Sequence, residues 1–269
     1  MNESMALTVV VRGVGDVGSA VAHRLFVEGY AVVIQDGPTP STTRRGMAFA
    51  DAVFDGTAIL ESVHAMRADD LARVKEALGD HRAIPVYVGD IEALLAGLRP
   101  EIFVDARMRK HQQADIQRGL ANFTVGLGPS LVAGHHADVV VETSWDRLGV
   151  IITDGSSLPL SGEPREIGGH ARDRYVYAPV DGVFRTKAGV GDLVREGQAI
   201  AEIGHTALRA PLDGVLRGLT RDGVPVSVRT KVIEVDPRGI AAEVRTIGER
   251  PRRIAEGVLE AIRAWEGGR

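Results

Sequence analysis

Residues 7–36 read LTVVVRGVGDVGSAVAHRLFVEGYAVVIQD, and this stretch gives the clearest indication of the fold class. Residues 7–12 form a continuous apolar run rich in β-branched side chains, which predicts a strand buried on both faces. GVGDVG follows directly, and apolar residues then recur at helical spacing as far as Gly29. A second strand is predicted over residues 31–35. The stretch is therefore expected to be a βαβ unit, which belongs in a mostly parallel sheet.

The rest of the first half alternates strand-like and helix-like segments. Helices are predicted over residues 70–78 and 91–98. Strands are predicted over residues 59–63, 84–88, 101–105, 123–127, 139–142 and 150–153. This alternation predicts an α/β fold, an N-terminal Rossmann-like doubly wound parallel sheet that spans residues 1–155. The Gly-, Pro- and Ser-rich stretch that follows predicts a linker over residues 156–177.

A repeat of period 32 marks the second half. APVDGVF at residues 178–184 recurs as APLDGVL at residues 210–216, and the register continues downstream. Two such copies predict two intertwined halves of a small all-β domain over residues 178–245. The pattern resembles the barrel-sandwich hybrid fold of biotinyl and lipoyl carriers. The hairpin at residues 204–209 contains no lysine for covalent attachment, so we expect a docking module, followed by a C-terminal helix within residues 246–269.

Composition limits the possible partners. The chain has 269 residues, 32 Lys and Arg against 36 Asp and Glu, and 4% aromatic residues, which argues against nucleic acid and anionic membranes as partners. It contains no Cys, which excludes disulfides, thiolate catalysis and Cys-ligated metals. No secretion signal or membrane span is recognisable, so a cytoplasmic location is expected.

The glycine-rich turn is the first candidate site. Gly13 and Gly15 would allow a tight turn and the approach of a phosphate, and Gly18 would allow close packing of helix and strand. Asp36 ends the second strand, where a carboxylate would accept from ribose hydroxyls and favour an NAD-like ligand over NADP. Asp16 would lie near any bound pyrophosphate, and a glycine turn that serves packing alone is the alternative.

Basic residues near two strand ends supply a second candidate. Arg44 and Arg45 follow the second strand, and Asp105, at the end of another, is followed by several basic residues that include Lys110. Together they suggest an anion-lined crevice, although solvated loops are the plainer alternative. His135 and His136 on an extended segment would point to opposite faces, so no metal site is predicted.

The ordered motifs resemble one family. They are VVVRGVGDVGSAVAHRL, PSTTRRGMAFADAVFDG, VGLGPSLVAGHHADVVVET, EPREIGG, APVDGVF, RAPLDGVLRG, KVIEVDPRG and IAEGVLEAI. In this order they are similar to the YqeB-like accessory proteins of selenium-dependent molybdenum hydroxylases, which are related through their Rossmann part to the XdhC/CoxI maturation factors. The resemblance spans nearly the whole chain. It includes the glycine turn, the Arg44/Arg45 pair, Asp105 with Lys110, and the loop that contains Gly128.

The resemblance implies an accessory factor that binds a phosphate-bearing cofactor, of molybdopterin or nucleotide type, and assists maturation of a molybdenum hydroxylase. The implied partners are that hydroxylase or its maturation enzymes and a small anionic ligand. Since the chain has no Cys, a partner would carry any persulfide or selenium chemistry. Homo-oligomerisation and the identity of the hydroxylase stay open.

Two other functions stay open. One is an NAD-dependent oxidoreductase that acts on a small substrate, and the other is a regulatory protein that senses a dinucleotide. No side chain is placed as an evident proton donor, which favours cofactor binding over catalytic oxidoreduction, and no catalytic residue is assigned.

Overall fold

The computed structural model describes residues 6–109, 114–160 and 164–268. Contacts between Cα atoms divide the chain into two compact units. Unit 1 comprises Met1–Pro38, Ala48–Leu160 and Ile247–Arg269, and unit 2 comprises Thr39–Met47 and Ser161–Thr246. The chain therefore passes from one unit to the other four times.

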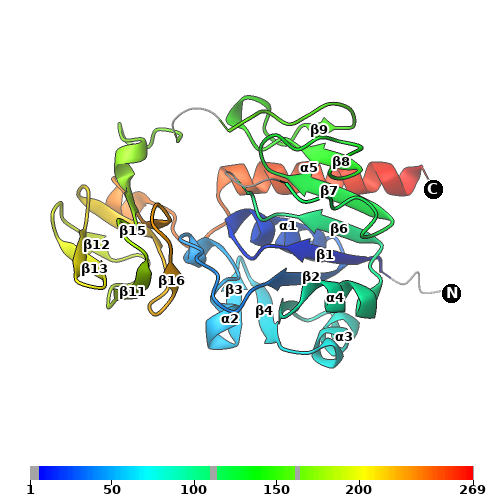
Figure 1. Ribbon diagram of the computed structural model, residues 1–269, viewed down its shortest axis with the longest axis horizontal. Helices are drawn as coiled ribbons and strands as arrows, with labels where there is room; N and C mark the ends of the chain where they lie inside the picture. The colour runs from blue at the N-terminus through cyan, green and yellow to red at the C-terminus, as the bar shows by residue number, and fades with distance from the viewer. Residues whose placement is uncertain (1–5, 110–113, 161–163, 269) are drawn as a thin grey trace. The chain divides into compact units, whose positions relative to one another are not determined.

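Unit 1 is built on a nine-stranded, mostly parallel sheet (Figure 1). Its strand order is β3-β4-β5-β2-β1-β6-β7-β8-β9, and only the edge strands β3 and β9 are antiparallel to their neighbours. The strands are β1 (Thr8–Arg12), β2 (Ala31–Asp36), β3 (Thr57–Leu60), β4 (Val63–Ala68), β5 (Ile84–Val88), β6 (Ile102–Asp105), β7 (Phe123–Leu127), β8 (Val139–Val141) and β9 (Ile151–Ile152).

Helices cover both faces of this sheet. Val9 and Val11 pack into the cluster that holds α1 and α5, whereas Val10 packs into a second cluster with α3 and α4. This alternation follows from the two-residue period of a strand. The helices are α1 (Asp16–Val27), α2 (Ala52–Asp55), α3 (Leu71–Asp80), α4 (Ile91–Leu98), α5 (Glu249–Gly267) and the short η2 (Trp145–Arg147).

Unit 2 consists of two four-stranded antiparallel sheets, ordered β10-β17-β15-β12 and β14-β13-β11-β16. The 32-residue repeat maps β11, β12 and β13 onto β15, β16 and β17, and the short strand of each copy pairs with the other copy. The strands are β10 (Tyr175–Tyr177), β11 (Gly182–Thr186), β12 (Leu193–Val194), β13 (Ala199–Ile203), β14 (Thr206–Arg209), β15 (Gly214–Leu219), β16 (Pro225–Val226) and β17 (Lys231–Asp236). Short helices are η1 (Arg45–Met47), η3 (Arg172–Arg174) and η4 (Gly239–Ala241).

The predicted α/β class is confirmed at this level: a large, mostly parallel sheet, two small antiparallel sheets, and a C-terminal helix packed on α1. The strand predicted over residues 59–63 is wrong, because Glu61 and Ser62 take positive φ angles of 45° and 67° and form the turn between β3 and β4. In the stretch predicted as a linker, the structure has η3 and β10, with Arg174 only 1% exposed. None of the described helices is long and apolar enough to span a membrane.

Candidate functional site

The glycine-rich turn lies where β1 ends, at the carboxyl edge of the unit 1 sheet. The chain leaves β1 for β2 on one side, and β6 flanks β1 on the other, so the turn marks a topological switch point. Open α/β sheets bind ligands at such points. Gly13 has a φ of 111°, and its N–H donates to the Gln35 carbonyl at 2.8 Å.

Gly18 serves packing. A Cβ at this position would lie 1.9 Å from the Gly13 carbonyl oxygen, so no larger residue fits without a backbone shift. Gly15 differs, because a Cβ built there has no neighbouring atom within 4 Å. Gly15 is the N-cap of α1, and no side chain caps the helix there. The first turn of α1 therefore borders open space in which an anion could approach backbone amides.

Two backbone amides of the turn, those of Val14 and Val17, donate hydrogen bonds to acidic side chains. The Val14 N–H donates to Asp36 Oδ2 at 2.7 Å, and the Gly37 N–H donates to Asp36 Oδ1 at 2.7 Å. The Val17 N–H donates to Asp16 Oδ1 at 3.1 Å. A carboxylate has about four acceptor positions, so Asp36 keeps capacity for a ribose hydroxyl.

A chain of ion pairs flanks the turn at the end of β6. Arg107 donates to Asp105 from Nε at 2.8 Å and from Nη2 at 2.5 Å, and Nη2 also contacts Asp115 at 3.0 Å. Arg109 contacts Asp115 at 2.8 Å. Arg12 ends β1 directly opposite Asp105. Three guanidinium groups and two carboxylates thus gather at the ends of β1 and β6, beside the carboxylates of Asp16 and Asp36 at the turn.

The pKa shifts reflect this crowding. Burial lowers the pKa of Arg12, and the nearby charge of Arg107 lowers it further. Burial alone would raise the pKa of Asp115, but the hydrogen bond and charge of Arg107 hold it below its usual range. The buried Nη1 of Arg107 has no hydrogen-bond partner among the described residues. An added anion would therefore be favoured electrostatically near these arginines.

Gly128 follows β7 and lines a pocket together with Asp105 and Arg109. Its φ is 144°, and its carbonyl accepts from the Ser157 hydroxyl at 2.7 Å. Lys110, the remaining basic residue predicted near this edge, lies outside the described residues.

Arg44 and Arg45 belong to unit 2, in the segment Thr39–Met47, whereas the glycine turn belongs to unit 1. Arg44 donates to Glu234 through Nε at 2.8 Å and Nη2 at 3.0 Å, and Arg45 Nε donates to the Leu219 carbonyl at 3.1 Å. Within unit 2, these bonds hold the segment against β15 and β17.

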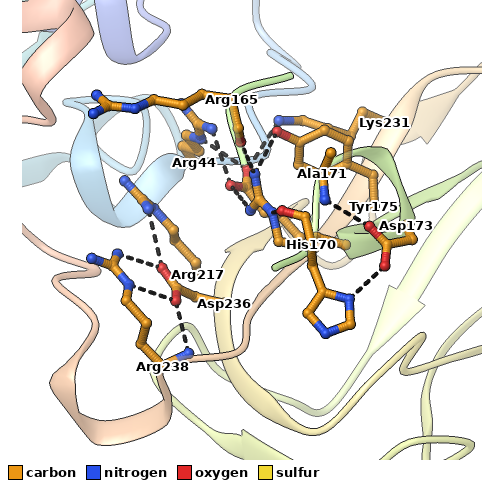
Figure 2. A network of polar contacts seen from close by, with 12 residues as sticks. Arg44, Arg165, His170, Ala171, Asp173, Tyr175, Arg217, Lys231, Asp236 and Arg238 are labelled. Carbon is orange, nitrogen blue, oxygen red and sulfur yellow. Dashed lines mark hydrogen bonds and ion pairs between the residues drawn. The ribbon is translucent and has the colours of Figure 1, made fainter. Parts of the chain in front are cut away.

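Arg44 is part of a network of charges (Figure 2). Glu234 is fully buried, and it also accepts from Arg174 and Lys231, both at 3.1 Å. A second buried carboxylate, Asp236, pairs with Arg217 at 3.1 Å and with Arg238 at 2.7 Å. Burial alone would raise the pKa of Glu234, but the charges of Lys231 and Arg44 hold it well below its usual range.

The sequence did not single out Arg12 or Glu234 as part of these clusters. A cation directly before a glycine-rich turn was a usable signal for Arg12, whereas nothing in KVIEVD separates a buried Glu from a solvated one. The histidine prediction needs one correction: His135 and His136 lie in a turn, and their rings meet edge to face at 4.7 Å instead of pointing apart. Across the described residues, no three His, Asp or Glu side chains cluster as metal ligands would.

No family model matches the chain. The protein YqeB of Escherichia coli (strain K12), described as uncharacterized, is 39% identical over 255 residues, which is 94% of this chain. This chain is a homologue of YqeB. It spans 47% of the length of YqeB, so about half of that relative has no counterpart here.

Solved structures resemble the chain only weakly. A succinylglutamate desuccinylase/aspartoacylase from Rhodobacter sphaeroides is 16% identical, with a TM-score of 0.24 over 76% of this chain and 57% of that one. The ectoine utilization protein EutE (DoeB) from Ruegeria pomeroyi is 14% identical, with a TM-score of 0.26 over 86% of each chain. Scores this low do not establish a shared fold.

Proposed function

We propose that unit 1 binds a phosphate-bearing ligand, of nucleotide or molybdopterin type, at the turn between β1 and α1, and that the protein acts as an accessory factor in molybdenum hydroxylase maturation. The open space over Gly15, at an uncapped helix start, carries the first part of this proposal. The ordered motifs that resemble the YqeB-like accessory proteins support the second part.

The residues at the turn fit a phosphate. Backbone amides at a helix start attract an anion, and the absent side chain of Gly15 leaves room for one. Arg12, Arg107 and Arg109 lie at the neighbouring strand ends, and the buried Nη1 of Arg107, which has no partner among the described residues, could donate to an added anion. A molybdopterin would supply the dithiolene ligation of molybdenum; the role of this chain would be to hold its phosphate end.

Unit 2 would then be the part of the chain to which a partner protein docks. Its two interlocked antiparallel sheets and its 32-residue repeat support a barrel-sandwich hybrid fold. The β13–β14 hairpin contains His205 and no lysine, so an attached swinging arm is not part of the proposal. The molybdenum hydroxylase, or an enzyme of its maturation, would bind this unit.

One observation favours a second function. Asp36 ends β2 beside the glycine turn, where a carboxylate suits the ribose of NAD, and an NAD-dependent oxidoreductase or a dinucleotide sensor would use it in this way. Purification from the native host, followed by mass spectrometry of the copurified ligand, separates these functions. Recovery of a pterin supports the maturation role, and recovery of NAD with substrate-dependent turnover contradicts it.

The phosphate site has a direct test. Titration calorimetry with ADP and with pyrophosphate should show binding to the full chain, and Gly15→Ala should weaken it at least about tenfold, because the methyl group occupies the space of the phosphate. Gly79→Ala supplies a control, since Gly79, an exposed residue of α3, also has no atom within 4 Å of a built Cβ and no positive φ. If Gly15→Ala binds ADP as tightly as the unchanged protein does, the turn is not the site.

A further inference from the structure

A pocket opens at the carboxyl ends of β6 and β7. It has an empty volume of about 430 Å³, part of it open to solvent, and Leu127, Leu131 and Ala137 form part of its apolar wall. Gln117 and His136 supply polar groups to the same wall. β7 lies two strands from β1, which corresponds to roughly 10 Å across the sheet. The pocket is therefore within reach of a ligand whose phosphate lies at Gly15.

Gln117 is the unusual residue of this pocket. It is only 3% exposed, and its Oε1 has no hydrogen-bond partner among the described residues. A buried acceptor without a donor costs free energy, so buried amide oxygens are nearly always paired. A donor supplied by a ligand would pair this oxygen.

His136 is held next to Gln117. The Gln117 N–H donates to the His136 carbonyl at 2.7 Å, so the two residues are joined through the backbone. His136 Nδ1 accepts from the Val132 N–H at 2.9 Å, which leaves the proton of the neutral ring on Nε2. Burial and the neighbouring His135 lower the pKa of His136, so the ring stays neutral at physiological pH. The residues that line the pocket thus include one with an N–H donor, His136, and one with an unpaired acceptor, Gln117.

The charged residues that line the pocket, Asp105, Arg109 and Asp115, are each held in an ion pair. Asp105 accepts from Arg107, and Asp115 accepts from both Arg107 and Arg109. Because both carboxylates already have arginine partners, neither needs a cationic ligand to balance its charge. A fully ionised phosphate group carries no donor for Gln117 and would face its oxygen unfavourably. The chemistry that fits is a neutral group with one N–H donor and one carbonyl acceptor.

We propose that this pocket binds an amide group, either a carboxamide or a ring lactam, whose N–H donates to Gln117 Oε1 and whose carbonyl accepts from His136 Nε2. The apolar wall then packs against the planar remainder of the group. This proposal extends the proposed function, because it assigns the pocket to the part of the ligand that does not carry phosphate. A nicotinamide and a pterin both present an amide of this kind.

Ligand-observed NMR on the full chain with nicotinamide and with pterin, neither of which carries phosphate, tests the proposal and separates the two sources. One of them should bind, and Gln117→Met should weaken that binding at least about tenfold while leaving the affinity for ADP unchanged. Gly15→Ala should instead weaken ADP binding at least about tenfold and leave the affinity for the nicotinamide or pterin probe unchanged. Gln198→Met makes the same change at an exposed position of unit 2 and should alter neither.

Folding of the Gln117→Met variant is expected to be intact, since the change removes an unpaired polar atom from a buried position. A melting temperature equal to or above that of the unchanged protein would agree with this. The amide proposal is overturned if neither probe binds, or if Gln117→Met binds the probe unchanged. A failure of ADP to bind, with amide binding intact, would overturn the phosphate site alone.

Discussion

The glycine turn of unit 1 and the arginine network of unit 2 are both places where an anion could be expected, yet they are built differently. At the turn, Gly15 borders open space, and Arg107, at the neighbouring strand end, has one guanidinium nitrogen without a partner among the described residues. In unit 2, Arg44 lies in a bidentate pair with the fully buried Glu234. Positive charge indicates a ligand site only where the protein has not already supplied the anion.

Removal of the central carboxylate of unit 2 should have the largest effect. Glu234→Gln leaves the buried Arg174 and its neighbours without their counter-charge, so we expect a loss of about 3–5 kcal/mol in the free energy of unfolding. Urea denaturation measures it. Glu202→Gln is the matched control, because Glu202 occupies the equivalent position of the other repeat copy and is exposed. Equal effects of the two changes would mean that the network does not stabilise unit 2.

The effect of Glu234→Gln on the free energy of unfolding should depend on pH. The pKa of Glu234 is held well below the usual 4.5, so its stabilising contribution is complete above that pH and is lost as the pH falls towards the folded-state value. The difference in unfolding free energy between the unchanged protein and Glu234→Gln should therefore shrink below about pH 4.5. A difference that stays constant from pH 7 to pH 3 would contradict the assignment.

Gly18→Ala should have the next largest effect, and it tests the turn itself. The added methyl carbon would lie 1.9 Å from the Gly13 carbonyl oxygen, so we expect a loss of about 3 kcal/mol, seen as a lower melting temperature. Gly15→Ala meets no atom and should cost about 1 kcal/mol or less. If the two variants melted alike, the division of the turn into a packing glycine and a ligand-facing glycine would be wrong.

Arg44→Ala tests whether Arg44 stabilises unit 2 or binds the ligand. It removes a charge-assisted pair from a buried carboxylate, which should lower stability by about 2 kcal/mol without changing the affinity for ADP. Arg185→Ala provides a reference, because its pair with Asp222 is exposed and 3.5 Å long, and should contribute little. An Arg44→Ala protein of unchanged stability that no longer bound ADP would make Arg44 a ligand residue.

Tyr30→Phe should cost about 1 kcal/mol at neutral pH, for the lost hydrogen bond from the phenol to Glu266. Burial, and then the bond to Glu266, raises the pKa of Tyr30 from 10.0 to about 12. The contribution of the protonated phenol is therefore complete below pH 10 and is lost as the pH rises towards 12. Thermal unfolding at pH 7 and pH 11 should show a smaller alkaline loss in Tyr30→Phe, whereas equal losses would contradict the shift.

Local sequence determined most of the secondary structure. The predicted strands over residues 84–88 and 123–127 and the helix over residues 91–98 match β5, β7 and α4 residue for residue. The 32-residue repeat correctly indicated that each copy pairs with the other. These features depend on hydrophobic period and on turn residues, both of which can be read from a few neighbouring positions.

Pairing between distant residues needed the tertiary structure. The sequence identified Arg44 as a cation but gave no sign of its partner 190 residues away. It assigned phosphate approach to Gly15 and packing to Gly18, but the open space at Gly15 and the carbonyl oxygen beside Gly18 are visible only in the structure. The unpaired oxygen of Gln117 is likewise defined by what surrounds it. Sequence specifies which groups a chain carries, whereas folding decides which of them already have partners, because long-range contacts set the burial and pairing of each side chain.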